Sequence, residues 1–166
     1  NCACIPGAGD NVTILNTHDI TLAAAGAVAD NLTVNSGGTL TLNNALATLT
    51  VGPACGGNRN YTNNGSLTIS AGTLTVGGNL EMTGFNSNFT MSGGNLVIDG
   101  NDGTSAGSIG INTPLLEIGS INTCSVTGGT ITIVDPHYDN ATVSQNYLSR
   151  LGTSFYYYDG TANWSG

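Results

Sequence analysis

Three oxygen-bearing side chains lie within four residues of one another in a glycine-rich stretch: Asp99, Asn101 and Asp102. Carboxylate and amide oxygens are the ligands that calcium prefers, and the spacing matches the start of a calcium-binding loop. The pattern is one residue short of that loop, and no Glu follows at the distance that a complete loop needs. A solvated turn is the default interpretation, and calcium is the one cofactor that the sequence suggests.

The cysteines form a second group with chemical potential, at positions 2, 4, 55 and 124. The Cys-x-Cys spacing of Cys2 and Cys4 differs from the Cys-x₂-Cys spacing typical of zinc sites, and Cys55 and Cys124 are isolated. We therefore expect disulfides, formed in an oxidising, extracellular setting. The chain starts at Asn1 without Met, which leads us to expect that a secretory signal has been removed. Several pairings are possible, and the sequence does not choose among them.

Carboxylates that could support hydrolysis are few. Glu81 and Glu117 each lie between two apolar residues, so both are expected to point outward from a strand. We expect them to lie about two turns of the repeat apart, roughly 10 Å, with no basic residue nearby. His18 and His137 have no Ser or Cys nucleophile in a recognisable motif. The sequence predicts no catalytic residues and no enzymatic activity.

Threonine pairs of the form Thr-x-Thr are a further candidate surface. Some solenoids bind ice through such pairs, repeated once per coil on one flat face. Here the intervals between pairs vary, and outward positions also hold Glu81 and Val97. Since Thr is favoured in strands generally, we attribute the pairs to strand propensity. The pairs are Thr39/Thr41, Thr48/Thr50, Thr73/Thr75 and Thr130/Thr132.

Aromatic residues concentrate near the C-terminus. Such a segment could cap the last coil of a repeat structure, dock on a neighbouring subunit or stack on sugar rings. We take these residues as candidates for assembly: Phe155, Tyr156, Tyr157, Tyr158 and Trp164.

Short strands are the elements that must position these groups. In residues 67–69, 74–76 and 80–82, two apolar residues flank a polar one, so the apolar pair faces one side. Glycine-rich or Asn-rich corners separate the strands, and no window has the apolar spacing of a helix. The same unit recurs from Val12/Ile14 to Ile131/Ile133. We expect Leu67, Leu74, Leu80 and Leu96 to be buried, and Thr68, Thr75 and Glu81 to be exposed.

The spacing of these units predicts a repeat architecture. Every second apolar pair starts 13 to 20 residues after the previous one, for example 80 − 67 = 13 and 32 − 12 = 20. Steps of this size match one coil of a stacked solenoid. The predicted fold is all-β, a parallel β-solenoid (β-helix) of about seven to eight short coils with an irregular aromatic C-terminal segment. We expect a leading segment at 1–10, the solenoid at 11–134, and a cap or assembly segment at 135–166.

Composition narrows the possible partners. Charged residues make up 7% of the 166 residues, and the net charge is −8 with Arg59 and Arg150 as the two basic residues. Nothing can neutralise the phosphates of nucleic acid or of an anionic membrane surface. No apolar run approaches the ~20 residues of a membrane span. We therefore expect no nucleic-acid partner and no membrane insertion.

Two runs carry a family resemblance. Residues 31–42, NLTVNSGGTLTL, and 65–80, GSLTISAGTLTVGGNL, resemble the β-helical repeats of large secreted surface proteins of Bacteroidetes-type bacteria. More loosely, they are similar to autotransporter adhesin passengers. The resemblance covers roughly residues 10–134. It implies an exported, cell-surface or matrix-forming protein, and it supplies no catalytic residues.

The expected function is therefore structural or adhesive. We see no clear cap at either end of the predicted solenoid, and a head-to-tail contact that does not close produces a filament. We expect a secreted or cell-surface protein that assembles with itself into a filament or surface layer. The alternative function is a carbohydrate-binding or carbohydrate-processing module that recognises surface glycans. The chain could also be a piece of a longer solenoid whose ends continue into more coils.

Overall fold

The computed structural model describes residues 5–52, 60–82, 84–98, 115–118, 122–133, 148–151, 154–157 and 162–165. All regular elements in these ranges are strands, so the prediction of an all-β protein is confirmed. The described part contains no helix, and therefore none that could cross a membrane. The strands are β1 (Asn11–Ile14), β2 (Asp19–Leu22), β3 (Ala27–Ala29), β4 (Asn31–Val34), β5 (Thr39–Leu42), β6 (Thr48–Val51), β7 (Asn60–Asn63), β8 (Ser66–Ile69), β9 (Thr73–Val76), β10 (Asn79–Met82), β11 (Asn88–Ile98), β12 (Leu115–Ile118), β13 (Thr123–Ile133), β14 (Leu148–Leu151), β15 (Ser154–Tyr157) and β16 (Ala162–Ser165).

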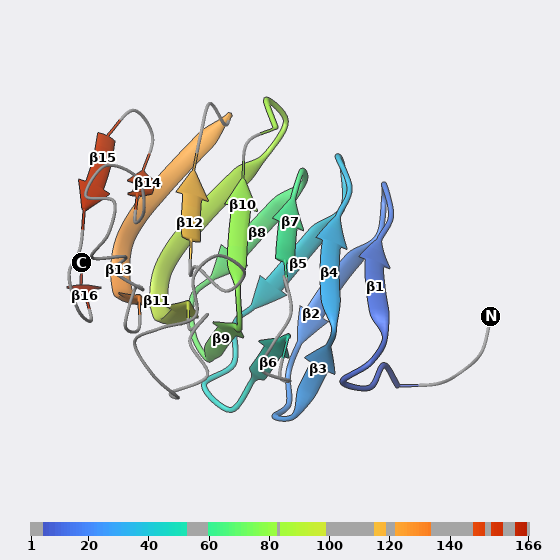
Figure 1. Cartoon of the computed structure of the whole chain (residues 1–166). Coiled ribbons are helices and arrows are strands. Elements are labelled where there is room, and N and C mark those ends of the chain that lie inside the picture. The colour runs from blue at the N-terminus through green and yellow to red at the C-terminus, as the bar shows by residue number, and fades with distance from the viewer. Residues whose placement is uncertain are drawn as a thin grey trace, which may run out of the picture.

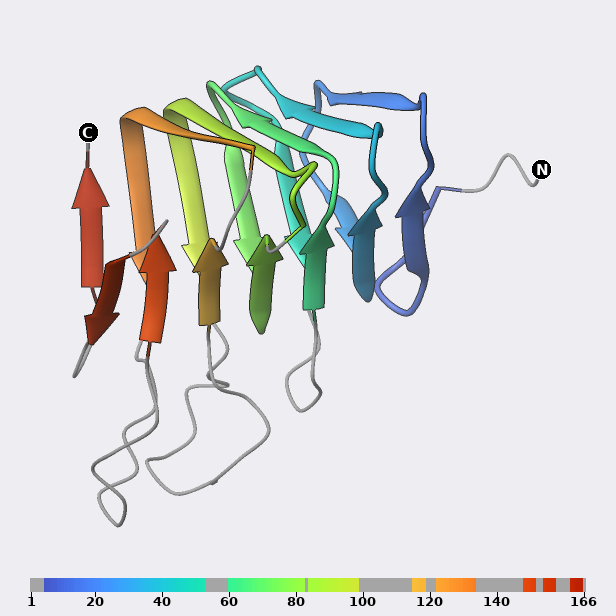
Figure 2. The ribbon, with the colours of Figure 1, turned by 90° about the horizontal axis from the view of Figure 1, so that it is seen from above.

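The strands wind into a stack of coils with three faces (Figures 1 and 2). Face A consists of β1, β4, β7, β10, β12 and β14, paired in parallel in that order. Face B consists of β2, β5, β8 and the first halves of β11 and β13. Face C consists of β3, β6, β9 and the second halves of the same two strands. The predicted parallel β-solenoid is thus confirmed.

Two long strands continue around a corner from face B to face C. β11 contributes residues 88–91 to face B and 95–98 to face C, and β13 does the same with 123–126 and 130–133. The register shifts at the corner, where Gly94 (φ 72°) and Gly129 (φ 89°) adopt a left-handed conformation. Glycine reaches this conformation at no steric cost, so the chain can bend sharply and continue.

The prediction of seven to eight coils is wrong, because each coil covers three faces rather than two, with β11 and β13 each covering two faces. Register pairs Val12 with Leu32, Leu32 with Tyr61, Tyr61 with Leu80, and Leu80 with Leu116. Five complete coils result, with β14 adding a sixth strand to face A. Apolar pairs on all three faces look alike in the sequence, so their spacing cannot reveal how many of them make one turn.

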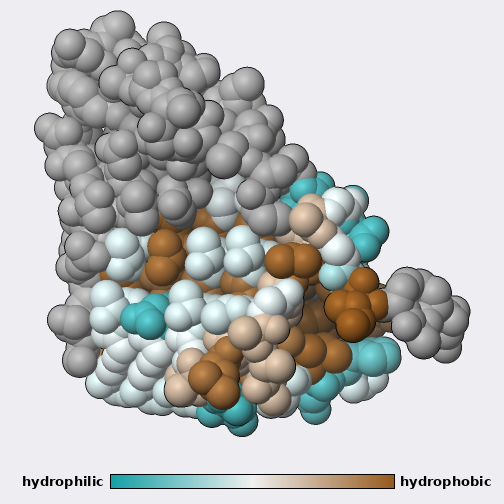
Figure 3. Space-filling view, turned by 90° about the horizontal axis from the view of Figure 1, so that it is seen from below, coloured by the Kyte–Doolittle hydropathy of each residue, from teal (hydrophilic) through white to brown (hydrophobic). Residues whose placement is uncertain are grey.

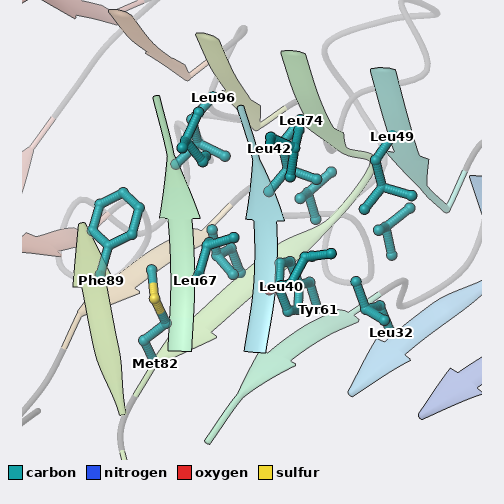
Figure 4. Close-up of a cluster of buried hydrophobic side chains, with 14 of the residues drawn as sticks. Leu32, Leu40, Leu42, Leu49, Tyr61, Leu67, Leu74, Met82, Phe89 and Leu96 are labelled. Atoms are coloured by element: carbon teal, nitrogen blue, oxygen red, sulfur yellow. The ribbon is translucent and has the colours of Figure 1, made fainter. Parts of the chain in front are cut away.

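Inward rows of apolar side chains fill the solenoid (Figure 4). Among the residues predicted to face inward, Leu67, Leu74, Leu80 and Leu96 are fully buried, which confirms the prediction. The residues predicted to be exposed are half-buried instead, because neighbouring coils above and below cover part of each side chain: Thr68, Thr75 and Glu81.

Connections between faces differ sharply in length. The corners on either side of face B are short in every coil, the longest being 83–87 and 43–47. The corner from face C to face A is different: it holds Asp30 alone in the first coil but residues 99–114 after β11 and 134–147 after β13. All the long connections therefore join a strand of face C to the next strand of face A.

The predicted C-terminal segment also contains strands. β14 pairs in parallel with β12, so face A extends past the predicted boundary at residue 134. β15 then pairs antiparallel with β14, and β16 pairs antiparallel with the second half of β13. The segment is therefore not irregular throughout, and its reversed strands cover part of the last coil (Figure 1).

Candidate functional site

The N-terminal coil is open on its outer side. β1 is the first strand of face A, β2 of face B and β3 of face C, and within the described residues nothing pairs with their outer edges. Such an edge presents a row of unpaired N–H and C=O groups, which can template pairing with another chain. Three strand edges are therefore unpaired at this end of the described solenoid.

The interior of this coil is apolar and reachable from outside. A cavity of about 460 Å³ lies here, lined by residues of the first two coils that include Val12, Ile20, Leu22, Leu40 and Leu49. Ile20 is 41% exposed although it faces inward. Figure 3 shows hydrophobic side chains, coloured brown, gathered at this end. The end thus combines open edges with an uncovered apolar interior.

The C-terminal end is built differently. The first half of β13 is the last described strand of face B, and it pairs only with β11. Two of its residues occupy inward positions and are exposed, Cys124 and Val126. Cys124 belongs to the row that starts at Ile20, and Val126 to the row that starts at Leu22. Face B is therefore open at both ends.

The aromatic candidates for assembly lie mostly on the two reversed strands. Phe155, Tyr156 and Tyr157 belong to β15, where Phe155 is in register with Arg150. Trp164 belongs to β16 and is in register with Ile131. Tyr158 lies outside the described residues. The four placed residues thus come to the C-terminal end of the solenoid, where a cap or a contact with another subunit is expected.

The cysteine and calcium candidates are only partly placed. Cys2, Cys4 and Cys55 lie outside the described residues, and so do the calcium candidates Asp99, Asn101 and Asp102. Cys124 is free, and partial burial raises the pKa of its thiol. In the ranges that the structure describes, no three His, Cys, Asp or Glu residues gather as a metal site would require. Disulfides and calcium binding remain predictions.

The two glutamates on face A are closer than expected. Glu81 and Glu117 are register partners on adjacent strands, so the expected separation of two coils is wrong. Glu117 is in turn the register partner of Arg150, so a basic residue occupies the next register position in this row. The expectation missed this row because residues 99–114 separate β11 from β12 and hide the regular stacking of the coils.

Face B carries a regular row of hydroxyl side chains, contrary to our expectation that the threonines do not align. Its central outward row repeats once per coil with no register shift. The row is Thr21, Thr41, Thr68, Thr90 and Ser125. A second outward row lies two residues earlier in each strand and consists of Asp19, Thr39, Ser66, Asn88 and Thr123. The signal in the sequence is a Thr or Ser that lies between two inward-facing residues. A search for Thr-x-Thr pairs finds only some of these positions.

The outward rows differ in the hydrogen bonds that their side chains make within the protein. In the second row, Asn88 Nδ2 donates to Ser66 Oγ at 3.2 Å, and Asn122 Nδ2 donates to Asn88 Oδ1 at 2.9 Å. On face A, Asn31 Nδ2 donates to Asn11 Oδ1 at 2.7 Å. The hydroxyls of the central row on face B take part in no hydrogen bond within the described part of the chain. These hydroxyls are available to an external partner.

No protein-family model, curated protein or solved structure matches this chain. The resemblance to secreted surface proteins of Bacteroidetes-type bacteria therefore stays a prediction from the repeat sequence.

Proposed function

We propose that this protein is an extracellular structural or adhesive solenoid that assembles end to end through its N-terminal coil. One observation carries the proposal: three unpaired parallel edges surround an apolar cavity of about 460 Å³ at that end. Covering Ile20 alone, which is 41% exposed, is worth about 1 kcal/mol.

A second copy of the chain is the occupant that fits this end. If β2 of one copy stacked on the first half of β13 of another, Ile20 would follow Cys124 and Leu22 would follow Val126 in the same inward rows. The outward residue that would meet Asp19 is Thr123, so no like charges would face each other. On faces A and C, β14, β15 and β16 lie beyond the last complete coil, so β1 and β3 of the incoming copy can pair there only if these three strands move aside.

Such a contact joins two different surfaces of the same molecule. A heterologous contact that does not close into a ring adds subunits without limit and produces a filament. Low charge density helps, because repulsion between stacked subunits stays modest. The extracellular location is supported by the cysteine content and by the repeat resemblance.

The test is the concentration dependence of molecular mass, measured by light scattering after size-exclusion chromatography. The wild-type protein should form larger species as concentration rises, and Ile20→Lys should remain monomeric because it places a charge in the open coil. Phe85→Lys is the matched control: Phe85 is 83% exposed but lies on the connection between β10 and β11. Circular dichroism checks that both variants fold.

Two results would overturn the proposal: a wild-type protein that stays monomeric at every concentration, or Ile20→Lys assembling as well as Phe85→Lys. Non-reducing gels of the assembled fraction show in addition whether Cys124 joins neighbouring copies by a disulfide.

A carbohydrate-binding or carbohydrate-processing module is the second candidate, favoured by the pairing of Glu81 with Glu117 beside Arg150. Adjacent strands lie ~4.8 Å apart, close to the separation of carboxyl groups in retaining glycosidases. A glycan array tests this candidate. Specific binding that is lost in Glu81→Gln would favour it, and an array without specific binding would remove it.

A further inference from the structure

We propose that face B is an ice-binding surface, with the central row of hydroxyls as its core. This inference is independent of end-to-end assembly, because it concerns the side of the solenoid and not its ends. The row runs through all five coils in register, and its neighbours on the face are also polar and small. The ligand would therefore be a surface with a repeating lattice rather than a single small molecule.

The geometry of the face suits a lattice in two directions. Equivalent residues on adjacent strands lie ~4.8 Å apart, and the two outward rows lie two residues apart along each strand, or ~6.7 Å. Oxygen atoms at the surfaces of hexagonal ice repeat at similar distances in two directions. Each Thr offers a hydroxyl that can join the lattice and a methyl group that borders it, so Thr41, Thr68 and Thr90 can order water in register with ice.

The side chains of the central row on face B have restricted rotamers, and their hydroxyls have no hydrogen-bond partner within the described residues. β-branched side chains have a restricted χ1, so little rotamer freedom is lost when a Thr on a strand meets its ligand. Thr41, Thr68 and Thr90 are half-buried between their neighbours, which restricts them further. In the described part of the chain their hydroxyls have no hydrogen-bond partner, whereas Asn88 and Ser66 in the next row bond each other.

The chemistry of the face favours ice over the other extended ligands. Polysaccharide surfaces are usually recognised through aromatic rings, and the two outward rows of face B contain none. Asp19, at the end of one row, is the only charged residue in these rows, so a charged mineral or polymer has no complementary surface. Ice is uncharged and presents only hydrogen-bonding oxygens.

The connections that flank this face are short in sequence. On both sides of face B the connections are short in every coil, and the long stretches 99–114 and 134–147 start from the far corner, between faces C and A. Face C is less suitable because its corresponding row is interrupted, running Val28, Thr50, Thr75, Val97 and Thr132. Face A is interrupted too, since Glu81 follows Thr62 in its outward row.

The third coil offers a matched set of variants, since it places one half-buried Thr on each face: Thr62 on face A, Thr68 on face B and Thr75 on face C. Each is changed to Tyr, which disrupts the lattice spacing wherever it stands. Thermal hysteresis and inhibition of ice recrystallisation are measured on purified protein. Thr68→Tyr should reduce both activities at least several-fold, and Thr62→Tyr and Thr75→Tyr should leave them unchanged.

Each outcome of these measurements supports or overturns ice binding by face B. A folded wild-type protein that neither shifts the freezing point nor inhibits recrystallisation overturns the inference. Equal losses in all three variants, or a loss in Thr75→Tyr alone, also overturn it, because face B would then have no special role. Co-sedimentation with microcrystalline cellulose or chitin without ice activity would assign the face to a polysaccharide instead. Ile20→Lys should retain ice activity, which separates this test from the test of assembly.

Discussion

The first and third coils have nearly the same strand pattern but very different interiors. Ile20 in the first coil is 41% exposed, whereas Leu67, two coils along the same inward row, is fully buried. Each strand alternates in the same way, so the difference does not come from the strand itself. Burial in this fold is supplied by the coils above and below, and a coil with one neighbour has only half of it.

The largest difference in stability loss between the inner coils and the first coil is expected when a charged residue replaces an inward one. Leu74→Asp should lower the free energy of unfolding by about 5 kcal/mol, because it places an unpaired carboxylate in the closed interior. Ile20→Asp should cost only about 1 kcal/mol, since water reaches that position. Urea denaturation of both variants measures the difference. If Leu74→Asp is as stable as the wild type, the assigned register is wrong.

A contrast in backbone crowding should come next. Gly94 and Gly26 both have a positive φ, but a Cβ on Gly94 would lie 2.7 Å from the Gly72 carbonyl oxygen, and one on Gly26 would meet nothing within 4 Å. Gly94→Ala should therefore cost about 3 kcal/mol, from strain and crowding together. Gly26→Ala should cost about 1 kcal/mol, from strain alone. Equal losses in chemical denaturation would contradict the tight stacking of inner coils.

Truncating one inward leucine in each coil should give a contrast of similar size. Leu67→Ala should cost about 3 kcal/mol, because it removes buried methyl groups and leaves a cavity between two coils. Leu22→Ala should cost about 1 kcal/mol, because Leu22 is only half-buried and borders an existing cavity. Thermal melting in dilute solution, where copies do not associate, is the appropriate measurement. A larger loss for Leu22→Ala would show that the first coil is covered in solution.

The smallest effect concerns a polar atom inside the third coil. Tyr61 is fully buried, and its hydroxyl has no hydrogen-bond partner in the structure as described. Tyr61→Phe removes this unpaired group and should stabilise the protein by up to about 1 kcal/mol. A clear loss of stability would show that the hydroxyl has a partner.

The same residue predicts a dependence on alkaline pH. Burial raises the pKa of Tyr61 above its ordinary value of 10.0, so near and above pH 10 the unfolded chain releases this proton more readily than the folded chain. Stability should therefore fall as pH rises past 10, and Tyr61→Phe should make that fall shallower. Melting curves of both proteins at several alkaline pH values test this, and parallel falls would contradict it.

The inward and outward positions could be predicted from the sequence, because alternation is a local property of each strand. Leu74 and Thr75 are examples: one is buried, and the other lies on the outer face. The stacking of coils could not be predicted, because it depends on how many strands complete a turn. Asp30 alone joins one pair of coils and residues 99–114 join another, so sequence distance does not measure spatial distance.

The candidate surfaces were predictable to the same extent. Thr41 and Thr68 could be assigned to the outside, but their place in one row of face B follows only from the register. The pairing of Glu81 with Glu117 was hidden in the same way. The sequence predicted no clear cap at either end: Ile20 is exposed at the N-terminal coil, whereas β15 and β16 cover part of the last coil.

The corner between faces C and A has a consequence for how the protein can evolve. It holds one residue after β3 and a long stretch after β11, yet Val12 stays in register with Leu32 and Leu80 with Leu116. A gene can therefore gain or lose codons at this corner without shifting the rows on either side. Recombination between two such corners would remove or duplicate a whole coil and leave every remaining row aligned. The molecule can thus change its length in evolution by whole coils, and each added coil lengthens face B by one hydroxyl.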